Sequence, residues 1–248
     1  MMMIMIQELI LRVALPSYRY GNGQCWQVDP KGERQPQITK LGGDGGNYES
    51  VAVDHRRERQ PIFYVTEDKE YGALRRYIPR YSNADVNWDT LHEDGSETTF
   101  LVFNDDGRTF EWTTNEQAAR NSQARYCPNL EGIDFGDDGS LYFVSKKRST
   151  LYVLDLLAKT YTSSSTVSGI LSGGGEWNHS PDQIVNGEGD HLYFTEDGGK
   201  TVGVYVIHKT TGKRYTMFEA YTDRYKYDET TGIAFSPNGK KMYAAFQD

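Results

Sequence analysis

Residues 131–166 read EGIDFGDDGSLYFVSKKRSTLYVLDLLAKTYTSSST, and their pattern sets the architecture. Short runs rich in aromatic and β-branched residues alternate with turns made of Gly, Asp, Lys and Ser, which predicts a four-stranded antiparallel unit. Residues 181–220 repeat the same order, from PDQIV to RYTMFEA. Repeats of about 40 to 50 residues built from short strands are typical of propeller blades.

Three other stretches match parts of this unit. The first unit begins with ESVAVD (49–54) and continues through IFYVTED (62–68) and GALRRYIP (72–79). Residues 81–130 extend or interrupt its outer part, and the polar run at 115–125 suggests a short helix. The last unit, residues 229–248, has two inner strands only, and residues 23–40 resemble an outer strand pair.

We therefore expect one all-β domain over residues 1–248, a β-propeller of four-stranded blades. Two arrangements fit the half-units at the ends: a partial six-bladed propeller, or a four-bladed ring closed by pairing of the terminal strands. Six blades at this spacing need about 280 to 300 residues. We favour the partial propeller, and with it a chain that is a fragment of a longer protein.

Composition narrows the function. The net charge of −8 argues against a nucleic-acid partner, which would require a basic stripe, and suits a cation or an anion held through a cation. No segment predicts a membrane span. Residues 1–18 form a poorly defined N-terminal segment, and a start inside a longer gene is favoured over a degenerate signal peptide because a basic n-region is lacking. Cys25 and Cys127 are either free thiols or one bridge.

An acidic residue starts the first strand of each unit. These residues are 82, 51 and 47 positions apart, and they are Glu49, Glu131, Asp182 and Glu229. The start of one strand and the end of its antiparallel neighbour lie on the same rim of a blade. The two TED pairs, Glu67-Asp68 and Glu196-Asp197, end such neighbours, so all eight acids should lie on one rim around the propeller axis.

A ring of carboxylates around one axis needs cations, because like charges repel and buried carboxylates without partners are costly. Oxygen ligands of this kind suit Ca²⁺, Mg²⁺ or Mn²⁺, and Fe³⁺ is compatible with them. The alternative is structural: an acid at a strand start often caps a turn. The recurring positions favour the metal site, with Glu49, Glu67, Asp68, Glu131, Asp182, Glu196, Asp197 and Glu229 as candidate ligands.

Catalytic residues are not defined by the sequence. His179 precedes Asp182 on a loop to the same rim and could ligate a metal or donate a proton. Lys146 and Arg148 belong to a basic turn that could hold an anion such as phosphate. All three are weak candidates, because loop histidines and basic turns are more often solvated surface.

These segments resemble the PhoX-like alkaline phosphatase family, long catalogued as a bacterial domain of unknown function. The resemblance is carried by GGNYESVAVD with YVTEDKEYGALRRYIP, EGIDFGDDGSLYF, SPDQIV with LYFTEDGG, and DETTGIAFSPNGKKMYAAFQ, over roughly residues 44–248. It implies a six-bladed propeller that hydrolyses phosphate esters with calcium and iron at the axis, outside the cytoplasm. It also implies Glu49, Glu131, Asp182 and Glu229 as metal ligands.

The chain departs from the family's catalytic members at one point. Those members carry an N-terminal region with a cysteine iron ligand, and Cys25 lies instead in an expected outer strand. Three functions therefore stay open: a calcium-dependent phosphoester hydrolase acting on a small phosphorylated substrate, a non-catalytic calcium-stabilised propeller for binding, and a lactonase-like propeller. A lactonase would need an axial Asn, for which Asn178 and Asn186 are the nearby candidates. The sequence does not indicate an oligomeric state.

Overall fold

The computed structural model describes residues 10–14, 23–56, 60–80, 87–167, 171, 174–177, 180–187, 189–198, 201–221, 229–236 and 238–247, apart from the side chains of 10–14, 201, 221 and 247. The strands are β1 (Ile10–Ala14), β2 (Gln24–Val28), β3 (Gln37–Ile38), β4 (Tyr48–Asp54), β5 (Ile62–Glu67), β6 (Arg75–Ile78), β7 (Glu97–Phe103), β8 (Phe110–Thr113), β9 (Leu130–Phe135), β10 (Ser140–Ser145), β11 (Thr150–Asp155), β12 (Thr160–Ser165), β13 (Ser180–Asn186), β14 (His191–Asp197), β15 (Thr201–His208), β16 (Arg214–Tyr221), β17 (Glu229–Phe235) and β18 (Met242–Gln247). The helices are α1 (Glu116–Tyr126) and two 3-10 turns, Lys40–Gly42 and Trp88–Leu91.

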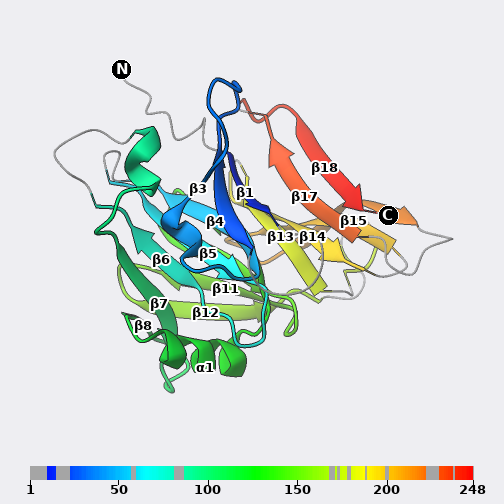
Figure 1. Cartoon of the computed structure of the whole chain (residues 1–248). Coiled ribbons are helices and arrows are strands. Elements are labelled where there is room, and N and C mark those ends of the chain that lie inside the picture. Colours follow the sequence, from blue (N-terminus) through cyan, green and yellow to red (C-terminus); the bar gives the residue numbers. More distant parts are fainter. Residues whose placement is uncertain are drawn as a thin grey trace.

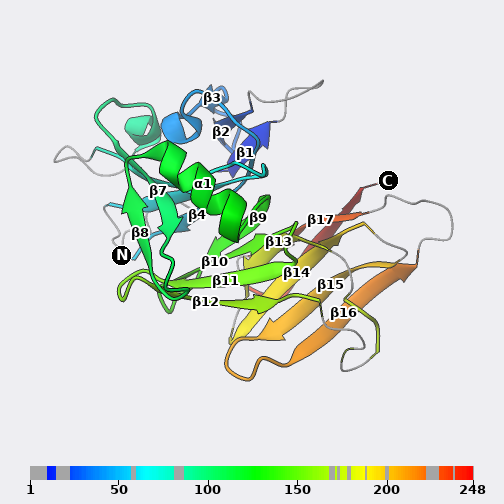
Figure 2. The same cartoon turned by 90° about the horizontal axis from the view of Figure 1, so that it is seen from below.

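The strands form five antiparallel sheets that follow one another along the chain, as Figure 1 and Figure 2 show. Their strand orders are β1-β2-β3, β4-β5-β6-β7-β8, β9-β10-β11-β12, β13-β14-β15-β16 and β17-β18. The innermost strands β4, β9, β13 and β17 pack side by side in that order. The prediction of an all-β propeller with four-stranded blades is confirmed.

The hydrophobic core lies between neighbouring sheets. One cluster joins Tyr64 of β5 to Phe143 of β10, and a second joins Tyr142 of β10 to Phe194 of β14. Aromatic side chains carry much of this contact; Phe143, for example, stacks on Tyr152 with ring centroids 5.2 Å apart. The β9–β12 sheet therefore buries both faces, one against each neighbouring sheet, which fixes these sheets face to face around the inner strands.

The 81–130 region supplies more than a loop. β7 is the fourth strand of its blade, β8 is a fifth, and the polar run forms α1, which packs against β7 and β8 (Figure 2). The expected outer pair at 23–40 forms as β2 and β3, and β1 adds a strand that the sequence did not indicate. Among the described strands, the first and last sheets are not hydrogen-bonded to each other, so closure of a ring by terminal strands is not seen there.

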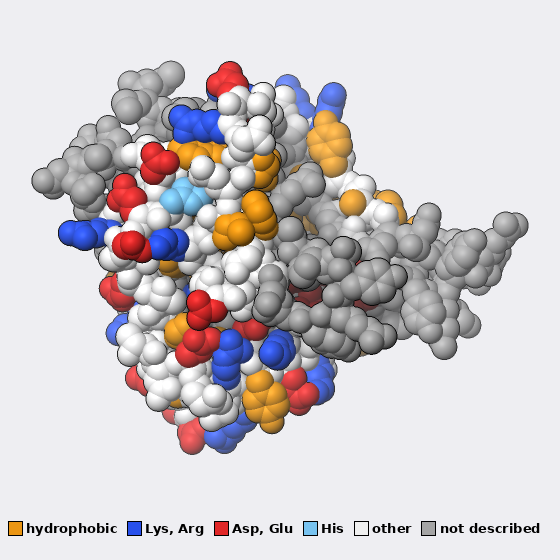
Figure 3. Space-filling view, in the orientation of Figure 1, with side chains coloured by type: hydrophobic (Ala, Val, Ile, Leu, Met, Phe, Trp, Pro, Cys, Tyr) orange, Lys and Arg blue, Asp and Glu red, His pale blue; other side chains and the backbone are white. Residues whose placement is uncertain are grey.

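Two further expectations concern the surface and the thiols. No helix among the described residues is long and apolar enough to span a bilayer. On the face seen in Figure 3, basic and acidic side chains are interspersed over the N-terminal sheets. Cys25 and Cys127 are both free and buried, so the bridged alternative is excluded.

Candidate metal centre

Each innermost strand carries a β-bulge at the end where its predicted acid lies. Between two consecutive residue pairs, β4, β9 and β13 each advance by three residues while the partner strand advances by two. In β17 the advance is two residues against one in the partner. The residue pairs that bracket the bulges are Tyr48–Glu67 with Val51–Val65, Leu130–Ser145 with Ile133–Phe143, Pro181–Glu196 with Ile184–Phe194, and Thr230–Phe246 with Gly232–Ala245. Bulges redirect side chains, so here the bulge sets the direction of Glu49, Glu131 and Asp182, and simple alternation does not run through it.

Three of the bulge acids converge. Glu49, Glu131 and Asp182 each offer a carboxylate oxygen, and these three oxygens all lie within 4.8 Å of one another. We call them the carboxylate triad. Gly132 makes the convergence possible, because a Cβ at this position would lie 2.4 Å from the backbone nitrogen of Ile184. Only a residue without a side chain lets β9 approach β13 this closely at the acids.

The triad is electrostatically strained. Burial, then the negative charges of neighbouring acids, raise the pKa of Glu49 to about 6, of Asp182 to about 8 and of Glu131 to about 10. The positive charge of Lys146 lowers all three pKa values and does not cancel the effect. Glu131 is 2% exposed, and its Oε1 accepts no hydrogen bond. These carboxyl groups are thus held close together, and burial with neighbouring negative charge favours their protonated forms.

Lys146 lies inside the acidic centre. Its Nζ forms ion pairs with Asp197 and, at 3.4 Å, with Oε1 of Glu131. Asp68 also faces the centre, since its charge raises the pKa of Glu49 and Glu131, and it accepts a hydrogen bond of 2.8 Å from Asn129. The ammonium group is therefore a countercharge among carboxylates.

Glu229 is displaced from the repeat position. Thr230 aligns with Tyr48, Leu130 and Pro181 by its strand pairing, so Thr231 holds the place that the triad acids hold in the other blades. Glu229 still reaches the edge of the centre, where its carboxyl hydrogen-bonds Asp197 and its pKa is raised to about 7. The prediction that Glu229 faces the same rim as a candidate ligand stays a prediction, and its place in the strand is two residues before that of the triad acids.

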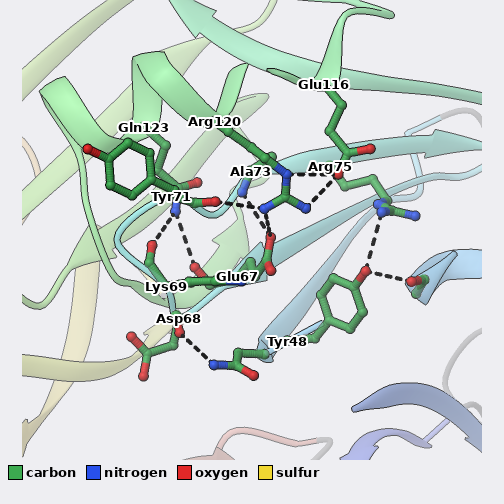
Figure 4. Close-up of polar contacts among 12 residues, drawn as sticks. Tyr48, Glu67, Asp68, Lys69, Tyr71, Ala73, Arg75, Glu116, Arg120 and Gln123 are labelled. Atoms are coloured by element: carbon green, nitrogen blue, oxygen red, sulfur yellow. Dashed lines mark hydrogen bonds and ion pairs between the residues drawn. The ribbon is translucent and has the colours of Figure 1, made fainter. Parts of the chain in front are cut away.

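The TED pairs divide between two faces. Successive strand residues point in opposite directions, so Asp68 and Asp197 face the triad while Glu67 and Glu196 face away. Glu67 accepts hydrogen bonds from the Ala73 backbone at 3.1 Å and from Arg120 of α1 at 3.2 Å (Figure 4).

Glu196 accepts a hydrogen bond of 2.9 Å from the Tyr205 hydroxyl. The charges of Glu67 and Glu196 are not among those that shift the triad's pKa values. The expectation that all four TED acids join one cluster is therefore corrected for these two glutamates, because their positions in the strands point them at neighbouring secondary structure.

Arg120 and Gln123 of α1 hold the turn that follows Glu67. Arg120 donates to the Tyr71 carbonyl at 2.7 Å, and Gln123 donates to the carbonyls of Glu67 and Lys69 at 3.2 and 3.0 Å (Figure 4). This turn carries Asp68. The inserted helix thus supports a wall of the centre, a connection that sequence spacing does not reveal.

The three catalytic candidates, His179, Lys146 and Arg148, lie in different surroundings. His179 lies outside the described residues. Arg148 donates to the Arg125 carbonyl at the end of α1, and Lys147 pairs with Glu70 at 3.0 Å, so the basic turn contacts protein groups. Lys146 forms ion pairs with Glu131 and Asp197. Its charge is therefore already paired, and this does not favour the expected anion site.

Sequence reasoning missed several polar residues at the centre. Thr66 and Thr195 accept hydrogen bonds from the backbone nitrogens that follow Glu49 and Asp182, at 3.0 and 2.8 Å, and so hold the bulges. Gln183 donates to Glu49 at 3.1 Å. The threonine of each TED motif was a usable signal, since it recurs at the same position in both blades.

Comparisons with known proteins bear on the fold. No family model matches the chain, and no curated protein matches it. PhoX of Pseudomonas fluorescens, solved in complex with vanadate, a transition state analogue, is similar to 90% of the chain with a TM-score of 0.68 and 15% identity. The chain spans about half of PhoX, 52% of its length.

Two other solved structures are less similar. A protein from Lactobacillus plantarum matches 97% of the chain and 75% of its own length, with a TM-score of 0.51 and 12% identity. The periplasmic gluconolactonase PpgL of Pseudomonas aeruginosa matches 96% of the chain and 75% of its own length at 11% identity, but its TM-score of 0.47 is too low to support an inference. At these identities the likenesses show the propeller fold alone.

Proposed function

We propose that this chain is the cation-binding propeller of a metal-dependent phosphoester hydrolase, with Ca²⁺ held by the carboxylate triad. The observation that carries the proposal is the convergence of three carboxylates from three different blades, two buried and that of Glu49 half-buried, with oxygens within 4.8 Å of one another. A bulge and a glycine contact are required to bring them there, and such a costly arrangement of like charges calls for a cation.

The donor set fits the ion. Oxygens bound to one Ca²⁺ at 2.3–2.6 Å lie at most about 5 Å apart, so the triad can share one ion with little movement. Carboxylate oxygens are hard ligands, which also suit Fe³⁺. Among the described residues, six carboxyl groups face the centre, those of Glu49, Asp68, Glu131, Asp182, Asp197 and Glu229, against one ammonium, that of Lys146. The remaining negative charge favours a divalent ion.

Substrate recognition would follow from the same charge balance. When bound, the cation would polarise a phosphoryl oxygen and attract a small phosphorylated substrate to a rim that is otherwise acidic. Asp68, Asn129 and Gln183 would orient the ligands around it through their hydrogen bonds. The likeness to PhoX with bound vanadate supports phosphate chemistry for this fold, as does the motif resemblance in the sequence.

A non-catalytic, calcium-stabilised propeller is the second candidate. The observation in its favour is the placement of the thiols: Cys25 and Cys127 belong to hydrophobic clusters, and burial raises the pKa of Cys25 to about 12. Neither thiol is placed as an iron ligand. Of the two Asn candidates for a lactonase, Asn186 bonds Lys209 at the far end of β13 and Asn178 lies outside the described residues.

One set of measurements separates these functions. The purified chain is titrated with CaCl₂ by calorimetry and assayed for hydrolysis of p-nitrophenyl phosphate and of a lactone, with Ca²⁺, with added iron and with EDTA. We expect Ca²⁺ binding and phosphatase activity in the wild type and in Asp105→Asn, a control on the surface, and loss of both in Asp182→Asn. Binding without turnover would favour the non-catalytic propeller, and lactone turnover alone would favour a lactonase. Absence of divalent-cation binding would refute the proposal.

A further inference from the structure

At one position of the repeat, the side chain is negatively charged in two blades and positively charged in the blade between them. In three blades the pair that precedes the bulge ends, on the second strand, at Glu67, Ser145 and Glu196. The residue that follows is Asp68 in the first blade, Lys146 in the next and Asp197 in the one after. Both aspartates face the triad, and so does the lysine. A cationic side chain thus occupies, in the middle blade, a place where its two neighbours present carboxylates.

The contacts of Lys146 are those of a cation held between carboxyl groups. Its Nζ lies against Asp197 on one side and 3.4 Å from Oε1 of Glu131 on the other. That oxygen accepts no hydrogen bond, and the Glu131 side chain is 3% exposed. Asp197 in turn hydrogen-bonds Glu229. Glu131 and Asp197 therefore contact the ammonium with oxygens of the type that the triad offers, and Glu229 lies beside Asp197.

We propose that the Lys146 ammonium fills a second cation position of this centre, between Glu131 and Asp197, and thereby limits the chain to one divalent ion. Removal of the ammonium would leave Glu131, Asp197 and Glu229 free to bind a second ion. The inference rests on the proposed function for the first ion, at the triad, and adds a residue that sets how many ions the centre holds.

Geometry and charge support this role over that of a surface lysine. Glu131 belongs both to the triad and to the lysine contact, so any divalent ion at the triad lies near the ammonium and repels it. Lys147, next in sequence, shows the contrast: its ion pair with Glu70 is half-exposed on both sides. The two lysines differ in their surroundings and share their chemistry, which makes Lys147 a matched control.

The test is metal stoichiometry. Wild type, Lys146→Met and Lys147→Met are titrated with CaCl₂ by calorimetry, and the metal content after equilibrium dialysis is measured by mass spectrometry. We expect one ion per chain in the wild type and in Lys147→Met, and two in Lys146→Met. Lys146→Arg, which keeps the charge, should stay at one. Lys146→Gln gives a second neutral variant, and circular dichroism checks that each variant is folded.

The outcomes separate the two proposals. One ion in the wild type and still one in folded Lys146→Met and Lys146→Gln would overturn the role of Lys146 and leave the proposed function standing. No ion in the wild type but one in Lys146→Met would overturn the triad site and support the ammonium as the group that excludes cations. No ion in any variant would overturn both.

Discussion

Replacing Glu131 with glutamine should stabilise the metal-free protein, although Glu131 is among its most buried polar residues. Burial and the charges of Asp68 and Glu49 raise the pKa of this carboxyl from 4.5 to about 10. At pH 8 the folded protein therefore keeps a proton there that the unfolded chain releases. Glutamine is neutral in both states and has nearly the same shape, so the variant removes this cost.

The size of the effect follows from the pH. Holding a proton at pH 8 on a group whose ordinary pKa is 4.5 costs about 5 kcal/mol, at 1.36 kcal/mol per pH unit. Rearrangement of the carboxylates and loss of the Lys146 contact reduce the gain, and we expect an increase of about 2 to 4 kcal/mol in the free energy of unfolding. In a chain of this size that raises Tm by at least about 4 °C.

The assay is urea unfolding at pH 8, in EDTA and in CaCl₂. Ca²⁺ at 100 times its Kd should stabilise the wild type by about 2.7 kcal/mol, and Glu131→Gln should lose most of this gain. Glu97→Gln, which removes an exposed partner of Arg76, should change stability by less than about 1 kcal/mol in either buffer. A Glu131→Gln protein less stable than wild type in EDTA would refute the reasoning, because the carboxylate would then be stabilising without metal.

Three further predictions follow from the same geometry. The triad carboxyls have pKa values of about 6, 8 and 10 when folded and near 4 when unfolded, so the folded protein binds more protons between these limits. The triad's contribution to metal-free stability is therefore full below about pH 4 and is lost as the pH rises towards 10. Urea unfolding in EDTA should show stability falling between about pH 6 and pH 9, and a rise over that range would contradict the raised values. Arg120→Met should lower the free energy of unfolding by about 3 kcal/mol and weaken Ca²⁺ binding, because it removes the ion-pair partner of the buried Glu67. Arg125→Met removes an exposed ion pair and should lower it by less than about 1 kcal/mol. Equal losses in the two variants would show that the bond to Glu67 is unimportant. Gly132→Ala should lower the free energy of unfolding by about 3 kcal/mol and reduce Ca²⁺ affinity at least tenfold, because its methyl group would push β9 away from the Ile184 backbone. If calorimetry gives this variant the wild-type affinity, the close approach of β9 to β13 is not needed.

Much of the fold could be read from local pattern. Aromatic strands, Gly- and Asp-rich turns and their repetition predicted the blades, because strand and turn preferences are local properties of the chain. The acids at the strand starts were found for the same reason, and three of them do meet at the centre. β1 was not indicated, since the pattern of residues 10–14 becomes a strand only by pairing with β2.

The details of the centre depend on distances that sequence spacing does not encode. One extra residue in each inner strand shifts which side chains face the axis, and a shift of one residue reverses the face. The pairing of β17 shows that Glu229 lies two places before the repeat position, and alternation separates Glu67 from Asp68.

The amino-acid sequence was enough to predict the all-β repeat, the strand order within each blade and the acidic residues at the starts of the inner strands. The tertiary structure decided which carboxylates share a site, that Gly132 brings β9 to β13, and that Lys146 lies among the acids. The physical reason is that secondary structure follows from interactions a few residues apart, whereas electrostatic coupling depends on side chains that meet only when separate sheets pack.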